Sequence, residues 1–82
     1  MSIQLNNLHM RVQGTIRVAG RVYTFTCEET NKDWMAESTK EDIYQELHEE
    51  NLDQCKGWEW ATNESYKIQK KLEKAKVRWR VA

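Results

Sequence analysis

Residues 10–27, MRVQGTIRVAGRVYTFTC, alternate apolar and polar side chains on both sides of Ala19-Gly20. Because successive side chains of a β-strand point to opposite faces, each arm of this stretch has one apolar face. The pattern predicts a β-hairpin that turns at Ala19-Gly20 through an even-numbered loop, so that the two apolar faces coincide. The pairs that this register places opposite one another are Ile16 with Tyr23, Gly14 with Phe25, and Val12 with Cys27. A glycine opposite Phe25 leaves room for the ring to lie across the partner strand.

The length and composition of the chain indicate one small globular domain. Eighty-two residues are too few for two independent cores, and a hydrophobic fraction of 39% with four Trp residues is enough for one. The formal net charge is zero, which argues against a surface devoted entirely to nucleic acid or membrane and removes the repulsion that opposes self-association. No apolar run has the length of a signal peptide or a membrane span, so we expect a cytoplasmic protein without membrane contact.

The two cysteines, Cys27 and Cys55, match no C-x-x-C or zinc spacing, and we expect buried free thiols. On one helix, His48 and Cys55 would lie two turns, about 10 Å, apart, which is too far to share a metal ion. The sequence therefore predicts no metal site and no cofactor.

A third strand is expected next to the hairpin. Residues 30–33 are typical of a turn, and a strand is expected after them at residues 33–37. This strand would place Trp34 and Ala36 on the same side as Phe25 and complete a three-stranded antiparallel meander. Residues 1–8 have no clear period, and we expect a lead-in whose Ile3 and Leu5 add to the sheet edge.

An acidic amphipathic helix is expected to pack on this sheet. Ser38 with Glu41 is a capping-box pattern, which predicts a helix that begins at Ser38. Ile43 and Leu47 form its apolar stripe. Two positions compete for its end, one near Asn51 and the other at Gly57 as a left-handed cap, and we favour Gly57.

The last third allows two interpretations. Alternation in residues 58–60 predicts a short strand, which could extend into a hairpin through residues 62–64. Residues 69–76 are rich in strong helix formers and Asn63 is a good N-cap, so we favour a basic helix over residues 63–76. Val77, Trp79 and Val81 then predict a terminal strand. The expected class is α+β, with the meander, the acidic helix, a short strand, the basic helix and the terminal strand in one domain of residues 1–82.

Charge is segregated along the chain. Residues 37–53 hold seven acidic side chains and one lysine, a net charge of 1 − 7 = −6, and residues 66–82 hold seven basic side chains and one glutamate, a net charge of 7 − 1 = +6. On helices these form two stripes. The acidic stripe consists of Asp42, Glu46, Glu49 and Asp53. The basic stripe consists of Lys67, Lys70, Lys71, Lys74, Arg78 and Arg80.

Three roles are possible for the stripes. Each can be a solvated face that pairs with the other stripe of the same molecule. Either can dock on another protein, the acidic one on a basic surface that normally holds nucleic acid. The basic segment, residues 67–80, can bind nucleic acid, with Trp79 or Tyr66 stacking on bases. Tryptophans of so small a chain are expected mainly in the core; Trp60 and Trp79 are the interface candidates because charged residues flank them.

No catalytic motif is present. The three glycines stand alone, and neither G-x-S-x-G nor H-E-x-x-H occurs. Glu49 and Glu50 diverge from His48 by about 100° per residue on a helix, so the three side chains do not share an acid–base site. His48 is expected on a helix surface. We therefore expect that the protein is not an enzyme. The sequence predicts an interaction protein that binds and modulates another protein through charged helices and an exposed tryptophan, in the manner of phage accessory regulators or inhibitors. A small nucleic-acid-binding protein and a structural subunit of a homo-oligomer are the alternatives.

Overall fold

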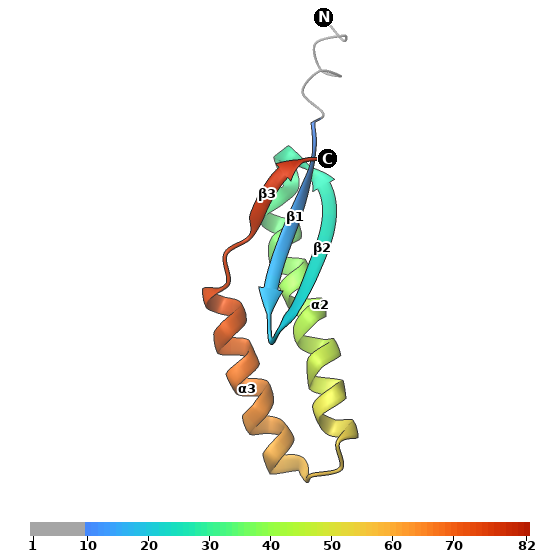
Figure 1. Cartoon of the computed structure of the whole chain (residues 1–82), viewed down its shortest axis with the longest axis vertical. Coiled ribbons are helices and arrows are strands. Elements are labelled where there is room, and N and C mark those ends of the chain that lie inside the picture. Colours follow the sequence, from blue (N-terminus) through green and yellow to red (C-terminus); the bar gives the residue numbers. More distant parts are fainter. Residues whose placement is uncertain (1–9) are drawn as a thin grey trace, which may run out of the picture.

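The computed structural model describes residues 10–82, which form one three-stranded antiparallel sheet and two helices (Figure 1). This confirms the α+β class; the expected lead-in at residues 1–8 lies outside the described residues. The elements in chain order are β1 (Arg11–Val18), β2 (Arg21–Glu28), the short 3-10 helix η1 (Glu29–Asn31), α2 (Lys32–Asp53), α3 (Trp58–Lys74) and β3 (Arg78–Val81).

The predicted hairpin and its register are confirmed. β1 and β2 pair antiparallel with Ile16 opposite Tyr23, and the same register places Gly14 opposite Phe25. The turn contains two residues with positive φ, Ala19 at 55° and Gly20 at 74°. Positive φ at both central residues is the type I′ geometry, whose twist matches that of the flanking strands.

The third strand comes from the end of the chain, and the prediction of a strand at residues 33–37 is wrong. The predicted terminal strand is confirmed as β3, which pairs antiparallel with β1 and gives the strand order β2-β1-β3. Residues 33–37 belong to α2, because Ala36 continues the buried helical stripe of Ile43 and Leu47 at spacings of seven and eleven residues.

The bounds of α2 differ from those predicted at both ends. It begins at Lys32, six residues before the expected cap at Ser38, and the Thr39 hydroxyl donates to the Met35 carbonyl inside the helix, with an O···O distance of 2.8 Å. It ends at Asp53, so Gly57 is not its cap. Cys55 instead takes the left-handed conformation, with φ of 56°, and Gly57 precedes α3.

The predicted strand at residues 58–60 is wrong, because α3 begins at Trp58. The basic helix is confirmed in kind, but it spans Trp58–Lys74 and not residues 63–76. Ala61, Ser65 and Leu72 are buried along it at spacings of four and eleven residues, and this stripe against α2 outweighs the short alternation of residues 58–60.

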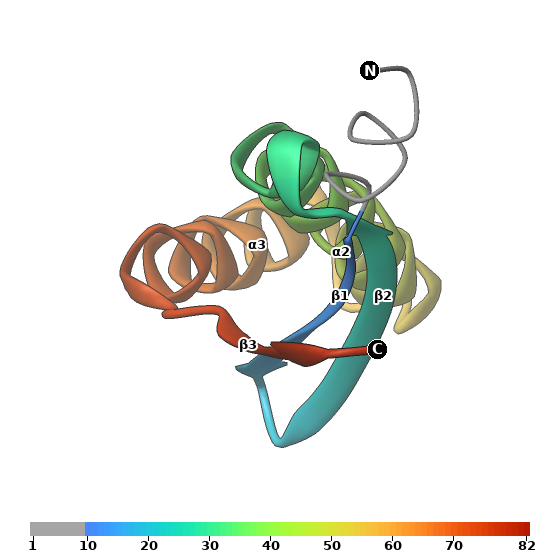
Figure 2. The ribbon, with the colours of Figure 1, turned by 90° about the horizontal axis from the view of Figure 1, so that it is seen from above.

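Both helices pack on one face of the sheet, as Figure 2 shows from above. Ile16 and Val18 of β1 meet Ile43 and Leu47 of α2 and Leu72 of α3 in the core. These strand residues have even numbers, so the odd-numbered side chains of β1 point to the opposite, outer face of the sheet. No helix of the described chain packs on that outer face.

Candidate functional site: an acidic groove and a basic sheet face

The acidic stripe predicted on α2 is divided by the structure. Asp42, Glu49 and Asp53 are exposed and have no ion pair within residues 10–82. Glu46 instead faces the hairpin. It accepts a hydrogen bond from the Tyr23 hydroxyl, with an O···O distance of 3.0 Å, and lies 3.7 Å from a guanidinium nitrogen of Arg21. Three of the four predicted carboxylates are therefore open to a partner.

Arg21 attaches the hairpin to α2. Both of its terminal nitrogens donate to the carboxylate of Glu50, at 2.7 and 2.6 Å. These hydrogen bonds hold the pKa of Glu50 below its ordinary value. The pKa of the Tyr23 hydroxyl is raised, first by desolvation and then by its hydrogen bond to Glu46. The two glutamates are thus structural contacts rather than part of an open acidic site.

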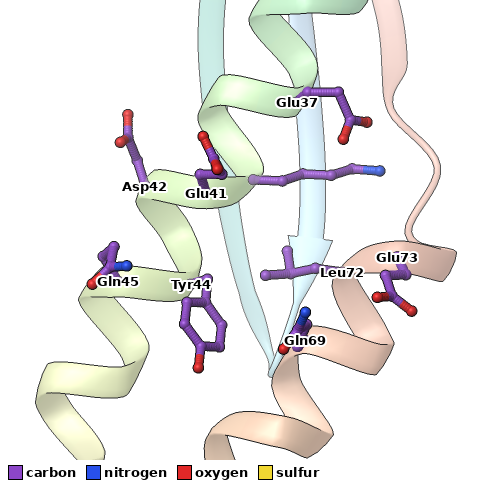
Figure 3. Close-up of a pocket in the computed structure, with 9 residues that line it drawn as sticks. Glu37, Glu41, Asp42, Tyr44, Gln45, Gln69, Leu72 and Glu73 are labelled. Carbon is purple, nitrogen blue, oxygen red and sulfur yellow. The ribbon is translucent and has the colours of Figure 1, made fainter.

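A groove of about 720 Å³ lies between α2 and α3, and four carboxylates line it (Figure 3). The carboxylates of this acidic groove are those of Glu37, Glu41, Asp42 and Glu73. Tyr44 and Leu72 supply apolar surface to its lining. Lys40 also lines the groove, and its ammonium group donates to the carbonyl of Ala75 at 3.0 Å, where it satisfies the end of α3.

The helical lysines of the basic stripe lie on another side of α3. All four, Lys67, Lys70, Lys71 and Lys74, are exposed. Lys67 and Lys71 are each two residues from Gln69, which lines the acidic groove, so they project about 200° around the helix from it. Lys67 pairs within α3 with Glu64 at 3.0 Å, and Lys70 lies over the ring of Tyr66 at 5.3 Å.

Each stripe is solvated, as one interpretation expected, but the two stripes do not pair with each other in the described chain. Among residues 10–82, no ion pair joins a carboxylate of α2 to a lysine of α3 or an arginine of β3. Arg78 and Arg80 belong to the outer face of the sheet, while Trp79 between them points inward. The structure therefore separates one acidic side from two basic surfaces.

The two tryptophans predicted as contacts are half-buried. Trp79 packs edge-on against Phe25, with ring centroids 5.4 Å apart, and Trp60 lies under the ammonium group of Lys56. The exposed tryptophans are Trp34, 70% exposed, and Trp58, 73% exposed. Sequence reasoning missed Trp34 as a surface residue because it placed residues 33–37 in a strand; its spacing of seven residues from Glu41 on α2 is the signal that a helical reading supplies.

The expectation that His48 is a solvated surface residue is wrong. It is half-buried, its Nδ1 lies 2.6 Å from the Ser65 hydroxyl, and its ring stacks on Tyr44. Asn51 also donates to the Ser65 hydroxyl, at 3.1 Å, so one buried oxygen joins α2 to α3. Cys27 and Cys55 are free as expected, but only Cys27 is buried.

Residues 10–82 contain neither a cluster of metal ligands nor a membrane-spanning helix. No group of three or more His, Cys, Asp or Glu side chains in this part of the chain is placed to hold a metal ion. None of its helices has the length and apolar character needed to cross a bilayer.

Comparison of the chain with protein-family models, with curated proteins and with solved structures found no match.

Proposed function

We propose that this protein is a non-enzymatic interaction module that binds another protein through the acidic groove. The supporting observation is that the groove gathers four carboxylates beside Tyr44 and Leu72, with Lys40 as the one cation of its lining. Such a surface suits a segment of the partner that carries Lys or Arg next to an apolar side chain. Opposite charge speeds the encounter and selects the orientation, while the apolar contact adds affinity.

The exposed side of α2 extends this surface. Trp34, Glu41 and Leu52 are separated by seven and eleven residues, so they lie along one line of the helix, and both Trp34 and Leu52 are exposed. A large exposed aromatic next to carboxylates is the composition of a protein-binding hot spot, because Trp buries a large area in a single contact. Glu49 and Asp53 continue the negative charge toward the end of the helix.

The non-enzymatic part of the proposal is supported by the Ser65–His48 contact. This is a serine and an imidazole within hydrogen-bond distance, which is the arrangement of an activated nucleophile. Ser65, however, is only 1% exposed and lies between two helices, so no substrate can reach its oxygen. The contact is better explained as a structural one between α2 and α3. A small module of this kind can act as a regulator or inhibitor by occupying a basic surface of its partner.

The test compares three forms of the purified protein as bait in a lysate of the source cells. Glu41→Gln with Asp42→Asn neutralises two carboxylates of the acidic groove. Asp33→Asn with Glu59→Gln removes the same charge from positions outside it, both of them exposed. We expect proteins retained by the wild type and by the control to be lost from the groove variant, as quantified by mass spectrometry. Retention of the same proteins by all three forms would contradict the proposal.

A further inference from the structure

The arginines and the lysines of this chain lie in different kinds of secondary structure. All five arginines lie in strands, whereas all eight lysines lie in helices or connections. Arg21 points to the inner face, where Glu50 binds it. The other four are exposed and belong to the outer face of the sheet: Arg11, Arg17, Arg78 and Arg80. Arginine is not interchangeable with lysine, because its planar fork can donate two parallel hydrogen bonds to a phosphate or to a guanine edge.

The register places these arginines among neutral hydrogen-bonding side chains. Thr15 has Thr24 on one side and Arg78 on the other, which makes one row across the three strands. The next row in the same direction contains Thr26, Gln13 and Arg80. Neighbouring strands are about 4.8 Å apart, so each row spans roughly 10 Å from β2 to β3.

Arg17 and Arg11 lie at the two ends of β1 beyond these rows, opposite Val22 and Glu28 respectively. Arg11 also donates to the Thr26 hydroxyl at 3.3 Å. In the described chain, Glu28 is the one carboxylate of the outer face and Val22 its one large apolar side chain. The face is therefore strongly positive and polar, and the partner that it fits is anionic.

We infer that the outer face of the sheet binds duplex DNA. No aromatic side chain of residues 10–82 belongs to this face, since Tyr23, Phe25 and Trp79 point inward. A single strand is held largely by bases stacking on aromatic rings, so the face lacks the feature that a single-strand site requires. Duplex DNA offers phosphates to the arginines and base edges in its major groove to Gln13 and the threonines, a groove that β-strands can enter.

The outer face is separate from the acidic groove, which carries the proposed function. The acidic groove lies between the helices, and the helices cover the inner face of the sheet, so the two surfaces are on opposite sides of the molecule. A-form RNA is a poorer fit to the outer face, because its major groove is too deep and narrow for side chains to read. The two sites have separate residues and separate tests.

The first experiment is fluorescence anisotropy of a labelled 20-base-pair mixed-sequence DNA duplex with the full chain, over a series of salt concentrations. Single-stranded DNA and duplex RNA of the same sequence are measured beside it. Four arginines that neutralise four phosphates predict a slope of log K against log salt of about −3.6. We expect the DNA duplex to be bound most tightly. Absence of duplex binding at low salt, or equal or tighter binding of the single strand or of the RNA duplex, would overturn the inference.

The second experiment locates the site. Arg78→Gln with Arg80→Gln removes two charges of the outer face and should reduce the magnitude of the salt slope by about 2. We expect its affinity at low salt to fall about tenfold or more. Lys70→Gln with Lys74→Gln removes the same charge from α3 and is the matched control, with a smaller effect expected. Equal losses in both variants, or a larger loss in the lysine variant, would assign binding to α3 and overturn the sheet site.

A third experiment uses the wild type, so its result does not depend on whether the variants fold. Nuclear magnetic resonance titration of the wild type with the DNA duplex should shift the amide signals of residues 11, 13, 15 and 17 and of β3. Shifts confined to the helices would contradict the inference. Circular dichroism of each variant establishes that it has the helical content of the wild type.

Discussion

Ala19 holds a backbone conformation that a side chain disfavours. Its φ is 55°, and the left-handed region costs an L-residue roughly 1–2 kcal/mol relative to glycine. We therefore expect Ala19→Gly and Ala19→Asn to raise the free energy of unfolding by about 0.5–1 kcal/mol, since asparagine also tolerates this region and Asn-Gly favours the type I′ turn. Urea denaturation measures the change. Ala75→Gly, at a residue with φ of −70°, is the control and should not stabilise the protein.

Gly14 is required by the ring that crosses it. A Cβ atom at this position would lie 2.5 Å from Cζ of Phe25 and 3.0 Å from Cζ3 of Trp79. We expect Gly14→Ala to lower the free energy of unfolding by about 1–3 kcal/mol, as overpacking a core does. Phe25→Leu in the same chain should recover part of the loss, because it removes the nearer ring. If Gly14→Ala alone unfolds at the same urea concentration as the wild type, the steric argument is wrong.

At the scale of the element, the hairpin and the terminal strand were predictable, but the position of the terminal strand beside β1 as the third strand of the sheet was not. The turn at Ala19-Gly20 and the alternation around it are local, so the register follows from residues 10–27 alone. The choice between residues 33–37 and β3 as the third strand depends on what covers Gly14, and Trp79 does so from more than sixty residues away. No local pattern contains that information.

The helix ends show a similar limit. The capping-box pattern at Ser38 is present in the sequence, but the buried stripe begins earlier at Ala36, and tertiary packing overrides a weak local signal. The wrong bounds of α2 also limited the prediction of the candidate site. Asp42 was predicted as a contact, whereas Trp34 was hidden by the strand assignment and Arg17 had no stripe to belong to.

The Arg21–Glu50 contact between the hairpin and α2 predicts that the stability of the folded protein depends on pH. The pKa of Glu50 is lowered in the folded protein, so the stabilisation from its pairing with Arg21 is present above the unfolded-state value near 4.5 and is lost as the pH falls through the lower folded-state value. We expect the melting temperature of Glu50→Gln to lie below that of the wild type at pH 7 and the two to converge by about pH 3.

Glu49→Gln is the matched control for this experiment, because Glu49 is the adjacent exposed carboxylate of α2 and holds no ion pair within residues 10–82. Its melting temperature should not show the same convergence. A difference between Glu50→Gln and the wild type that stays constant from pH 7 to pH 3 would contradict the argument.

At the scale of the whole molecule, a net charge of zero conceals two opposed faces. The acidic groove of one copy complements the arginine face of another, and with no net repulsion this contact predicts weak head-to-tail association at low salt. We expect light scattering to show a mass that rises with concentration in about 10 mM salt and stays at the monomer value in about 0.3 M salt, where screening is strong. A mass independent of salt would contradict the contact, and a stable high-salt oligomer would favour the structural-subunit alternative.

The pairing of β3 with β1 has a consequence for how the chain can be rewired. The Ala82 amide donates to the Arg11 carbonyl at 3.1 Å, so these two positions are neighbours, while residues 54–57 form an exposed turn far from both (Figure 1). A circular permutant that opens at this turn and joins residue 82 to residue 10 by a short flexible linker keeps every strand pairing. In that order the three strands become consecutive in sequence, and the sheet can form from near neighbours before the helices close over it.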